Sequence, residues 1–262
     1  MGAVGHGRAS AGRIEGGSPD VAASIFKYSV EYMSRRHRLP PRAFKDTIYG
    51  QFARITKALA SPVRLEIVDV LAQGERSVES LAREVDQSVA NASQHLRNLK
   101  AAHLVETRRE GTFVFYRLAD ERVIDVWRAV RALGERQLAE LERAVEALRG
   151  AAHEAESIDA AALLRRLAEG DVILLDVRPE AEYRAGHIAG ARSLPVSELE
   201  EHLAELPPEV TVVAYCRGRY CLMSDAALAV LREHGRHGLR LAEGLPDWRA
   251  AGLPVEADRE LV

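Results

Sequence analysis

The two cysteines of the chain, Cys216 and Cys221, stand in one short loop. The apolar run 210–215 before it is short and β-rich, which predicts a buried strand, and the spacing of apolar residues after it predicts a helix. Cys216 is therefore expected among inward-pointing backbone N–H groups, at the positive end of a helix dipole. Arg217 and Arg219 add positive charge. All these influences lower a thiol pKa and favour the nucleophilic thiolate, which disfavours the alternative of an inert buried cysteine.

With two further motifs, this loop resembles the active-site loop of the rhodaneses, sulfurtransferases that carry sulfane sulfur as a cysteine persulfide. The upstream motif comprises residues 175–178, 182–183 and 186–191, and the downstream motif lies within residues 243–255. The predicted elements are helices over 159–169, 196–206, 223–234 and 245–250, and strands over 172–177, 210–215 and 239–242. Alternating strands and helices are typical of an α/β fold with a parallel sheet. We expect a rhodanese domain over residues 158–258, with its reactive loop at the carboxyl end of a strand.

The resemblance implies a sulfur-transfer reaction at Cys216. The thiolate would attack the outer sulfur of thiosulfate or a low-molecular-weight persulfide and pass that sulfur to a thiol or to cyanide. Backbone N–H groups of residues 217–221 would stabilise the persulfide anion, while Arg217 and Arg219 would attract anionic donors. The implied catalytic residues are Cys216, Arg217, Gly218, Arg219, Tyr220 and Cys221. No cofactor is expected, and whether sulfurtransferase turnover is itself the task of the protein stays open.

Departures from related folds restrict this chemistry. The loop is one residue shorter than in related phosphatases and arsenate reductases, and Leu222 stands where they place an arginine, which disfavours phosphoryl or arsenate chemistry. Cys221 is either a small filler with a weak S–H donor or a resolving thiol that closes a disulfide with Cys216. Four further polar residues are catalytic by type, but the resemblance implies that they brace the sheet and the turn after it: Asp176, Arg178, Glu182 and His187.

The N-terminal half has the pattern of a winged helix-turn-helix, mostly α with a β-hairpin wing. Ser61-Pro62 is a helix-start signature, Ser77 caps a short helix, and Ser88 caps a longer one that runs to about residue 103. Two β-rich runs flank residues 109–112, which predicts a hairpin. Residues 46–120 resemble the ArsR/SmtB family of winged-helix repressors. The residues that carry this resemblance are 59–65, 93–96, Leu99, 102–105, 108–111 and 116–118.

The helix after Ser88 is expected to read DNA. Its inward positions are Val89, Ala92, Leu96 and Leu99, and its predicted DNA-binding residues are Ser88, Asn91, Ser93, Gln94, His95, Arg97, Asn98 and Lys100. Amide, imidazole and guanidinium groups can hydrogen-bond base edges in a major groove, while Ser88 and Lys100 suit phosphates. On the wing, Arg108 and Arg109 would reach the backbone or a minor groove. Singly, each of these residues could be ordinary solvated surface, and His95 could simply pack.

A long helix is predicted over residues 120–149, with apolar residues at three- and four-residue steps. This seam suits a partner helix, so we expect a homodimer that presents two reading heads to a palindromic double-stranded operator about one turn apart. The alternative is packing within one chain. Metal-sensing relatives carry a cysteine pair in the first helix of the motif, or His, Asp or Glu ligands on the dimer helix. Residues 77–81 contain no cysteine and residues 120–149 no histidine, so no metal site is expected here.

Charge and composition fit two domains of different character. The net charge is −3, but residues 1–150 carry +5 and residues 151–262 carry −8, as expected if only the first half meets a polyanion. Two cysteines in one loop do not make a disulfide framework, and no apolar run is long enough to span a membrane, so a cytoplasmic setting is expected. The predicted domains are a disordered tail over 1–20, a DNA-binding and dimerisation domain over 21–149, beginning with a helix over 21–39, a linker over 150–157, and the rhodanese domain.

Three functions fit these expectations. The first is a transcriptional repressor of the ArsR type whose rhodanese domain takes up sulfane sulfur on Cys216, sensing or processing reactive sulfur. The second is a thiosulfate or persulfide sulfurtransferase with an autoregulatory DNA-binding domain. The third is a thiol-based arsenic(III) sensor that uses both cysteines, for which two sulfurs are few.

Overall fold

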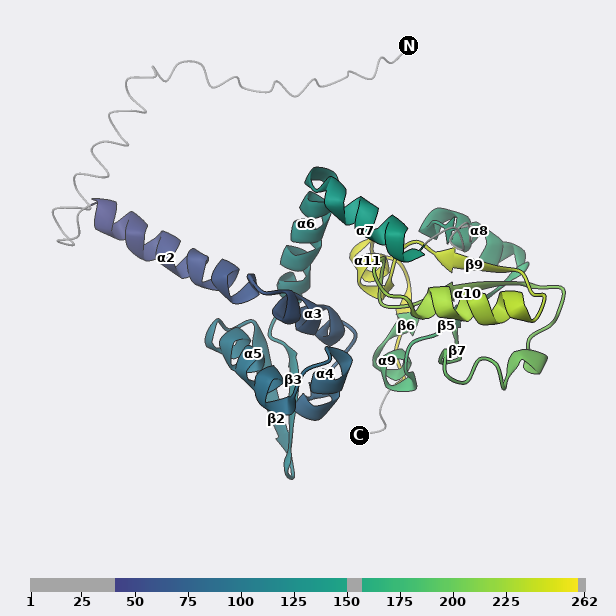
Figure 1. The fold of residues 1–262 in the computed structure, drawn as a ribbon, viewed down its shortest axis with the longest axis horizontal. Helices are drawn as coiled ribbons and strands as arrows, with labels where there is room; N and C mark the ends of the chain where they lie inside the picture. The colour runs from purple at the N-terminus through teal and green to yellow at the C-terminus, as the bar shows by residue number, and fades with distance from the viewer. Residues whose placement is uncertain (1–40, 150–156, 259–262) are drawn as a thin grey trace, which may run out of the picture. The chain divides into compact units, whose positions relative to one another are not determined.

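A computed structural model describes residues 41–149 and 157–258 (Figure 1). The chain divides into two compact units, residues 1–54 and 55–262. The predicted tail over 1–20 and the predicted helix over 21–39 lie outside the described residues, as does all of the predicted linker except its last residue, Ser157. The domain boundaries drawn from the sequence therefore stay predictions.

The first described helix, α2 (Pro41–Leu59), begins at a proline, which suits the first helical position. The apolar residues of this helix are only partly buried. Leu59 is buried, whereas Ile48, Phe52 and Ile55 are exposed. This helix therefore presents large apolar side chains to solvent.

The helix-turn-helix region forms as the caps predict. Helix α3 (Pro62–Leu71) follows Ser61, while Ser77 and Ser88 begin α4 (Val78–Glu84) and α5 (Val89–Ala101) by accepting backbone N–H bonds of 3.2 Å at Oγ. The side chain of Ser61 makes no capping bond. The three helices enclose one apolar core, whose completely buried members are Ile67, Val68, Leu81, Leu96 and Leu99. The prediction that Val89 faces inward is wrong: its side chain is 46% exposed, because the first turn of α5 extends beyond the core.

The wing is a hairpin of β2 (Val105–Glu110) and β3 (Phe113–Leu118). Its turn is tighter than predicted, since Glu110 already pairs with Phe113 and Gly111 takes a left-handed φ of 57°. Such a φ costs glycine little, which explains a glycine at this tip. A third strand that the sequence did not predict, β1 (Arg76–Ser77), pairs antiparallel with β3 and ties the wing to the start of α4.

The predicted single helix over 120–149 is wrong in its middle. Helix α6 (Arg122–Gln137) ends where Leu138 takes an extended backbone, and α7 (Ala139–Arg149) follows. Gly134 lies in the last turn of α6, and glycine weakens a helix by about 1 kcal/mol relative to alanine, which favours a break near this point. The apolar seam therefore divides between two helices.

The C-terminal region contains a five-stranded parallel sheet in the order β4-β9-β8-β5-β7, as the α/β pattern predicts. The strands are β4 (Ser157–Ile158), β5 (Val172–Asp176), β7 (Arg192–Ser193), β8 (Thr211–Tyr215) and β9 (Gly238–Leu241). The helices are α8 (Ala160–Glu169), α9 (Glu180–Ala185), α10 (Met223–Glu233) and α11 (Leu245–Ala250). Two short strands, β6 (His187–Ile188) and β10 (Val255–Glu256), pair antiparallel with each other.

Side chains of the central strands alternate between two cores on opposite faces of the sheet. Val213 and Tyr215 of β8 pack into one core with α8 and α11, while Val212 and Ala214 pack into the other with α10. This double burial explains the unbroken apolar run before Cys216.

The predicted helix over 196–206 is wrong. Only a 3₁₀ turn, Leu203–Glu205, forms there. The segment begins beside the sheet, because Leu194 and Val196 donate their N–H groups to the carbonyls of Asp176 and Val177 at 3.0 and 3.1 Å.

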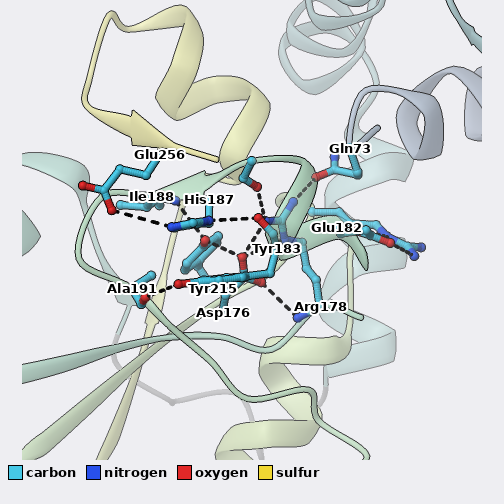
Figure 2. Close-up of polar contacts among 12 residues, drawn as sticks. Gln73, Asp176, Arg178, Glu182, Tyr183, His187, Ile188, Ala191, Tyr215 and Glu256 are labelled. Carbon is cyan, nitrogen blue, oxygen red and sulfur yellow. Dashed lines mark hydrogen bonds and ion pairs between the residues drawn. The ribbon is translucent and has the colours of Figure 1, made fainter. Parts of the chain in front are cut away.

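A buried polar network sits at the end of β5 (Figure 2). Arg178 and Asp176 are fully buried and joined by a 2.8 Å bond from Nε to Oδ1, and Arg178 also donates to Oε1 of Gln73 at 2.8 Å. The Tyr215 hydroxyl donates to Asp176 Oδ2 at 2.5 Å. Nearby, the ring of His187 stacks on Tyr183 with centroids 3.7 Å apart. These contacts give Asp176, Arg178 and His187 bracing roles at the end of the sheet.

We predict that Arg178→Met lowers the free energy of unfolding by about 3–5 kcal/mol, because it leaves the Asp176 carboxylate buried without its cation. The measurement is urea-induced unfolding. Arg117→Met is the matched control, since its ion pair with Glu106 is exposed and contributes at most about 1 kcal/mol. Equal losses in the two variants would show that the buried pair is not a structural requirement.

Candidate functional site

The sulfur loop, residues 216–221, connects the carboxyl end of β8 to the start of α10. The Cys216 side chain is 3% exposed. Its Sγ lies 3.3 Å from Ser224 Oγ, 3.6 Å from the Cys221 carbonyl oxygen and 3.8 Å from the Gly218 carbonyl oxygen. The loop therefore holds the thiol at the base of a small polar enclosure beside the helix start, as the strand-loop-helix pattern predicts.

The environment of Cys216 favours its thiolate. A hydrogen bond from the Cys221 thiol lowers the pKa of Cys216 to about 6, against the opposing effect of burial. The Ser224 side chain and the backbone N–H groups of Ser224 and Gly218 add to this effect. The same bond raises the pKa of Cys221, because its proton is held by Cys216. Sequence reasoning missed Ser224, although serine is a common residue at a helix start.

Arg217 is bound by carboxylates on two elements. Its Nη1 lies 2.7 Å from Glu84 Oε2 at the end of α4, and its Nη2 lies 2.5 Å from Glu182 Oε1 on α9. Glu182 is fully buried, and Arg76 Nη2 reaches it at 3.2 Å. Since its guanidinium is committed to these two carboxylates, Arg217 has less charge to offer an anionic donor than the sequence suggested. No local pattern marks Glu84 as its partner.

Behind the loop, Gly244 leaves no room for a side chain. A Cβ there would lie 2.1 Å from the Arg217 carbonyl oxygen and 2.5 Å from Gly218 Cα. Contact of backbone with backbone at this distance requires glycine. The loop is thus supported from behind by the segment that begins α11.

The predicted DNA-reading residues gather on α5. Ser88, Asn91, Gln94, Arg97, Asn98 and Lys100 are exposed, whereas Ser93 and His95 are half-buried. Arg97 Nη2 donates to Gln94 Oε1 at 2.7 Å, and Lys100 Nζ donates to Thr107 Oγ1 at 2.7 Å. Within the described residues, His95 Nδ1 is buried without a hydrogen-bond partner. The exposed set forms a continuous polar surface on the second helix of the motif.

The two wing arginines differ. Arg109 is exposed, while Arg108 pairs with Glu75 and Glu110, each at 2.7 Å, and lies over the Phe115 ring. Arg108 must therefore exchange carboxylate partners before it can bind a phosphate, which makes Arg109 the simpler contact.

A winged helix-turn-helix and a parallel α/β domain with a thiolate loop together define a DNA-binding regulator with a rhodanese-like domain. A helix-turn-helix domain model matches residues 59–108 and a rhodanese-like domain model matches residues 159–251. The chain belongs to the ArsR-type family of transcriptional regulators, as its sequence motifs predicted. Within residues 41–149 and 157–258, no helix combines the length and apolar character needed to cross a membrane.

Several known proteins are similar to this chain. The HTH-type transcriptional regulator Rv0324 of Mycobacterium tuberculosis is 45% identical over 212 residues, which cover 81% of this chain and 93% of that protein. A sulfurtransferase of Allochromatium vinosum is 36% identical over 101 residues, or 38% of this chain and 94% of that protein. A solved winged helix-turn-helix domain from Mycobacterium bovis, described as homodimeric, is 44% identical and covers 36% of this chain and 87% of its own, with a TM-score of 0.34.

We predict that the thiolate absorbance of Cys216 titrates with a midpoint near pH 6, so that the thiolate predominates above that pH and is lost below it. Cys221→Ala should raise the midpoint because it removes the main hydrogen-bond donor, whereas Cys221→Ser, which keeps a donor, should raise it less. The measurement is ultraviolet absorbance against pH, with Cys216→Ser subtracted as background. An unchanged midpoint in Cys221→Ala would contradict the assigned cause.

Proposed function

We propose that the protein is a homodimeric transcriptional repressor whose affinity for a palindromic operator changes when Cys216 takes up sulfane sulfur. The observation that carries this proposal is the position of Arg217. It directly follows the reactive cysteine, and its guanidinium binds Glu84 at the end of α4, the first helix of the helix-turn-helix motif. This contact offers a route from the sulfur loop to the DNA-binding region that does not pass through the predicted linker over 150–157.

The Arg217–Glu84 ion pair is placed to pass a movement of the sulfur loop on to α4. The Arg217 and Glu84 side chains are 10% and 27% exposed, so salt and water weaken their attraction less than at an open surface. A second contact lies nearby, where the Tyr220 hydroxyl donates to Glu135 of α6 at 2.8 Å. Because Gly244 packs against the backbone of Arg217 and Gly218, the loop has little room to shift toward Gly244 when Cys216 gains a sulfur atom. Movement of Arg217 would alter the support of α4 and hence the placement of α5.

The sulfur step needs no external oxidant. The Cys216 thiolate attacks the outer sulfur of thiosulfate or of a persulfide, the donor S–S bond breaks, and sulfite or a thiolate leaves with the bonding electrons. The product is the Cys216 persulfide. Its anion would be stabilised by the N–H groups of Gly218 and Ser224, which support the thiolate in the resting loop. Transfer of that sulfur to a thiol or to cyanide would restore the thiolate.

DNA binding would use the exposed polar surface of α5. Asn91, Gln94 and Arg97 would face base edges, and Ser88, Lys100 and Arg109 would bind phosphates. Ser93 and His95 are half-buried, so they would act mainly by packing and by orienting their neighbours.

The dimer would form through exposed apolar side chains of α6 and of Leu138, the residue that follows it. Val126, Val130, Leu133 and Leu138 are each at least 40% exposed. The first three recur at steps of four and three residues, which places them on one face of α6. Side chains of this size rarely remain in water together without a partner.

A second candidate function, a sulfurtransferase with an autoregulatory DNA-binding domain, is favoured by the lowered pKa of Cys216, which suits repeated turnover. The two candidates differ in one measurable respect. In the repressor the sulfur state of Cys216 changes operator affinity, and in the autoregulated enzyme it does not.

We predict that Glu84→Gln uncouples the two halves. Wild-type protein should bind its own upstream DNA with a different affinity before and after treatment with thiosulfate or polysulfide. Glu84→Gln should still load sulfur on Cys216 but lose most of that difference, because Arg217 no longer has an ionic partner on α4. The measurements are mobility-shift titration and intact-protein mass spectrometry.

Glu233→Gln, an exposed carboxylate on α10, is the control for loss of one negative charge, and Cys216→Ser is the control for loss of the sulfur acceptor. If Cys216→Ser responds to the donor as wild type does, the sensing role is wrong. If Glu84→Gln responds as wild type does, the route through Arg217 is wrong.

We predict that Leu133→Glu converts the dimer to a monomer and weakens operator binding at least tenfold, because one reading head is lost. Light scattering gives the mass, and mobility shift gives the affinity. Leu164→Glu, at a partly exposed position of α8, should leave both unchanged. A Leu133→Glu protein that remains dimeric would place the interface elsewhere.

A further inference from the structure

The two faces of the wing point to different parts of the molecule. Side chains alternate along β2, so Thr107 and Arg109 share one face while Arg108 lies on the other. Thr107 is hydrogen-bonded to Lys100 of α5, which places the first face beside the DNA-reading helix. Arg108 therefore lies on the outer face of the wing, the face that is turned away from α5.

Glu75 binds the guanidinium of Arg108 on that outer face. Its carboxylate accepts hydrogen bonds from Nε at 3.2 Å and from Nη2 at 2.7 Å, a two-point geometry that fixes the direction of the arginine. The guanidinium carbon lies 4.8 Å from the centre of the Phe115 ring, directly opposite on β3. Glu110 adds one bond from within the hairpin, through a side chain that is 67% exposed. Arg108 thus has its firmest partner outside the hairpin, just before β1.

The segment that carries Glu75 is held by the rhodanese-like domain. Gln73 accepts the 2.8 Å bond from the buried Arg178 (Figure 2). Gly74 takes a left-handed φ of 140°, and a Cβ there would lie 2.8 Å from the Cβ of Ala185 on α9. A side chain at this position would therefore force the segment away from α9.

Arg76 extends this attachment to the sulfur loop. Its Nη2 lies 3.2 Å from Oε1 of the buried Glu182, and the same oxygen is 2.5 Å from Arg217 Nη2. Its Nη1 donates to the Glu75 carbonyl oxygen at 2.9 Å. These contacts form a continuous series from Arg217 to Glu75, and from there to the wing.

The two strands of the wing are attached to this segment separately. Strand β1, which starts at Arg76, pairs with β3 over two residues. The Glu75–Arg108 ion pair holds β2 instead. Because the short ladder contacts one strand only, the ion pair supplies a further point of attachment, on the outer face.

We propose that Arg108 is a positioning residue rather than a DNA ligand: through Glu75 it ties the wing to residues 73–76, so that the direction of the wing follows the rhodanese-like domain. The inference rests on the DNA binding of the proposed function but not on sulfur uptake. It adds a route from the sulfur loop to the wing, beside the one that leads to α4. Arg109, on the α5 face, keeps the role of phosphate contact.

Titration of DNA with single and double variants tests the inference. Glu75→Gln removes a negative charge, so electrostatics alone predicts tighter DNA binding, whereas loss of the tie predicts weaker binding. Glu75→Gln and Arg108→Gln should each lower the affinity of the full-length protein for its own upstream DNA about two- to fivefold, the range of an exposed ion pair. The double variant should lose no more than either single variant, because both remove the same contact. Glu106→Gln, which removes another exposed carboxylate from the outer face of β2, is the control and should not weaken binding.

Salt dependence separates a tie from a phosphate contact. Each phosphate contact adds about 0.9 to the steepness with which the logarithm of affinity falls against the logarithm of salt concentration. Arg109→Gln should therefore flatten this slope by about 0.9 for each wing, whereas Arg108→Gln should leave it unchanged. A flatter slope in Arg108→Gln, or tighter binding by Glu75→Gln, would overturn the inference.

Hydrogen exchange of the free protein gives a second readout that needs no DNA. Glu75→Gln and Arg108→Gln should speed amide exchange in the wing, residues 105–118. Gly74→Ala should do the same, because its Cβ displaces the segment from α9, whereas Gly170→Ala, at a left-handed glycine with open space around it, should not. Unchanged wing exchange in Gly74→Ala would show that the rhodanese-like domain does not hold the wing. If wild type does not bind its upstream DNA, the proposed function fails, and exchange in these variants still decides the inference.

Discussion

The guanidinium of Arg217 is the point on which the arrangement of the sulfur loop depends. The Arg217 side chain is 10% exposed, and a charge buried to this degree is costly unless it is paired. Two carboxylates, one on α4 and one on α9, supply that pairing. The backbone just after Cys216 is thus anchored in front by these ion pairs and supported behind by Gly244.

A second buried contact reinforces the first. Arg178 binds Asp176 within the rhodanese-like domain and Gln73 beside the helix-turn-helix region, and both Arg178 and Gln73 are buried. Buried polar pairs of this kind contribute little net stability compared with apolar residues of the same size, but they fix one geometry, because any shift leaves a charge unpaired. The Arg178–Gln73 contact is thus a second fixed connection beside the Arg217–Glu84 ion pair.

The sequence predicted the local features well and the long-range ones poorly. Caps at Ser77 and Ser88, the apolar run before Cys216 and the two family resemblances are local patterns, and the structure and comparisons confirm the elements and domains they indicate. The break at Leu138 and the loss of a helix over 196–206 depend on context outside the segment.

The partners of Arg217 lie 35 and 133 residues away, so no spacing rule could identify them. The exposure of Val89 likewise depends on where the core ends.

The opposite pKa shifts of the two cysteines bear on the two interpretations of Cys221. While Cys216 is a thiolate it holds the proton of Cys221, whose pKa is raised, so Cys221 acts as a donor and is a poor nucleophile. Once Cys216 carries a sulfane sulfur, its charge moves to the outer atom and that hydrogen bond must be remade. Only then could Cys221 lose its proton and attack Cys216, releasing sulfide and closing a disulfide. The lowered pKa of Cys216 and the raised pKa of Cys221 therefore favour Cys221 as a hydrogen-bond donor to Cys216 over a resolving thiol in the resting loop.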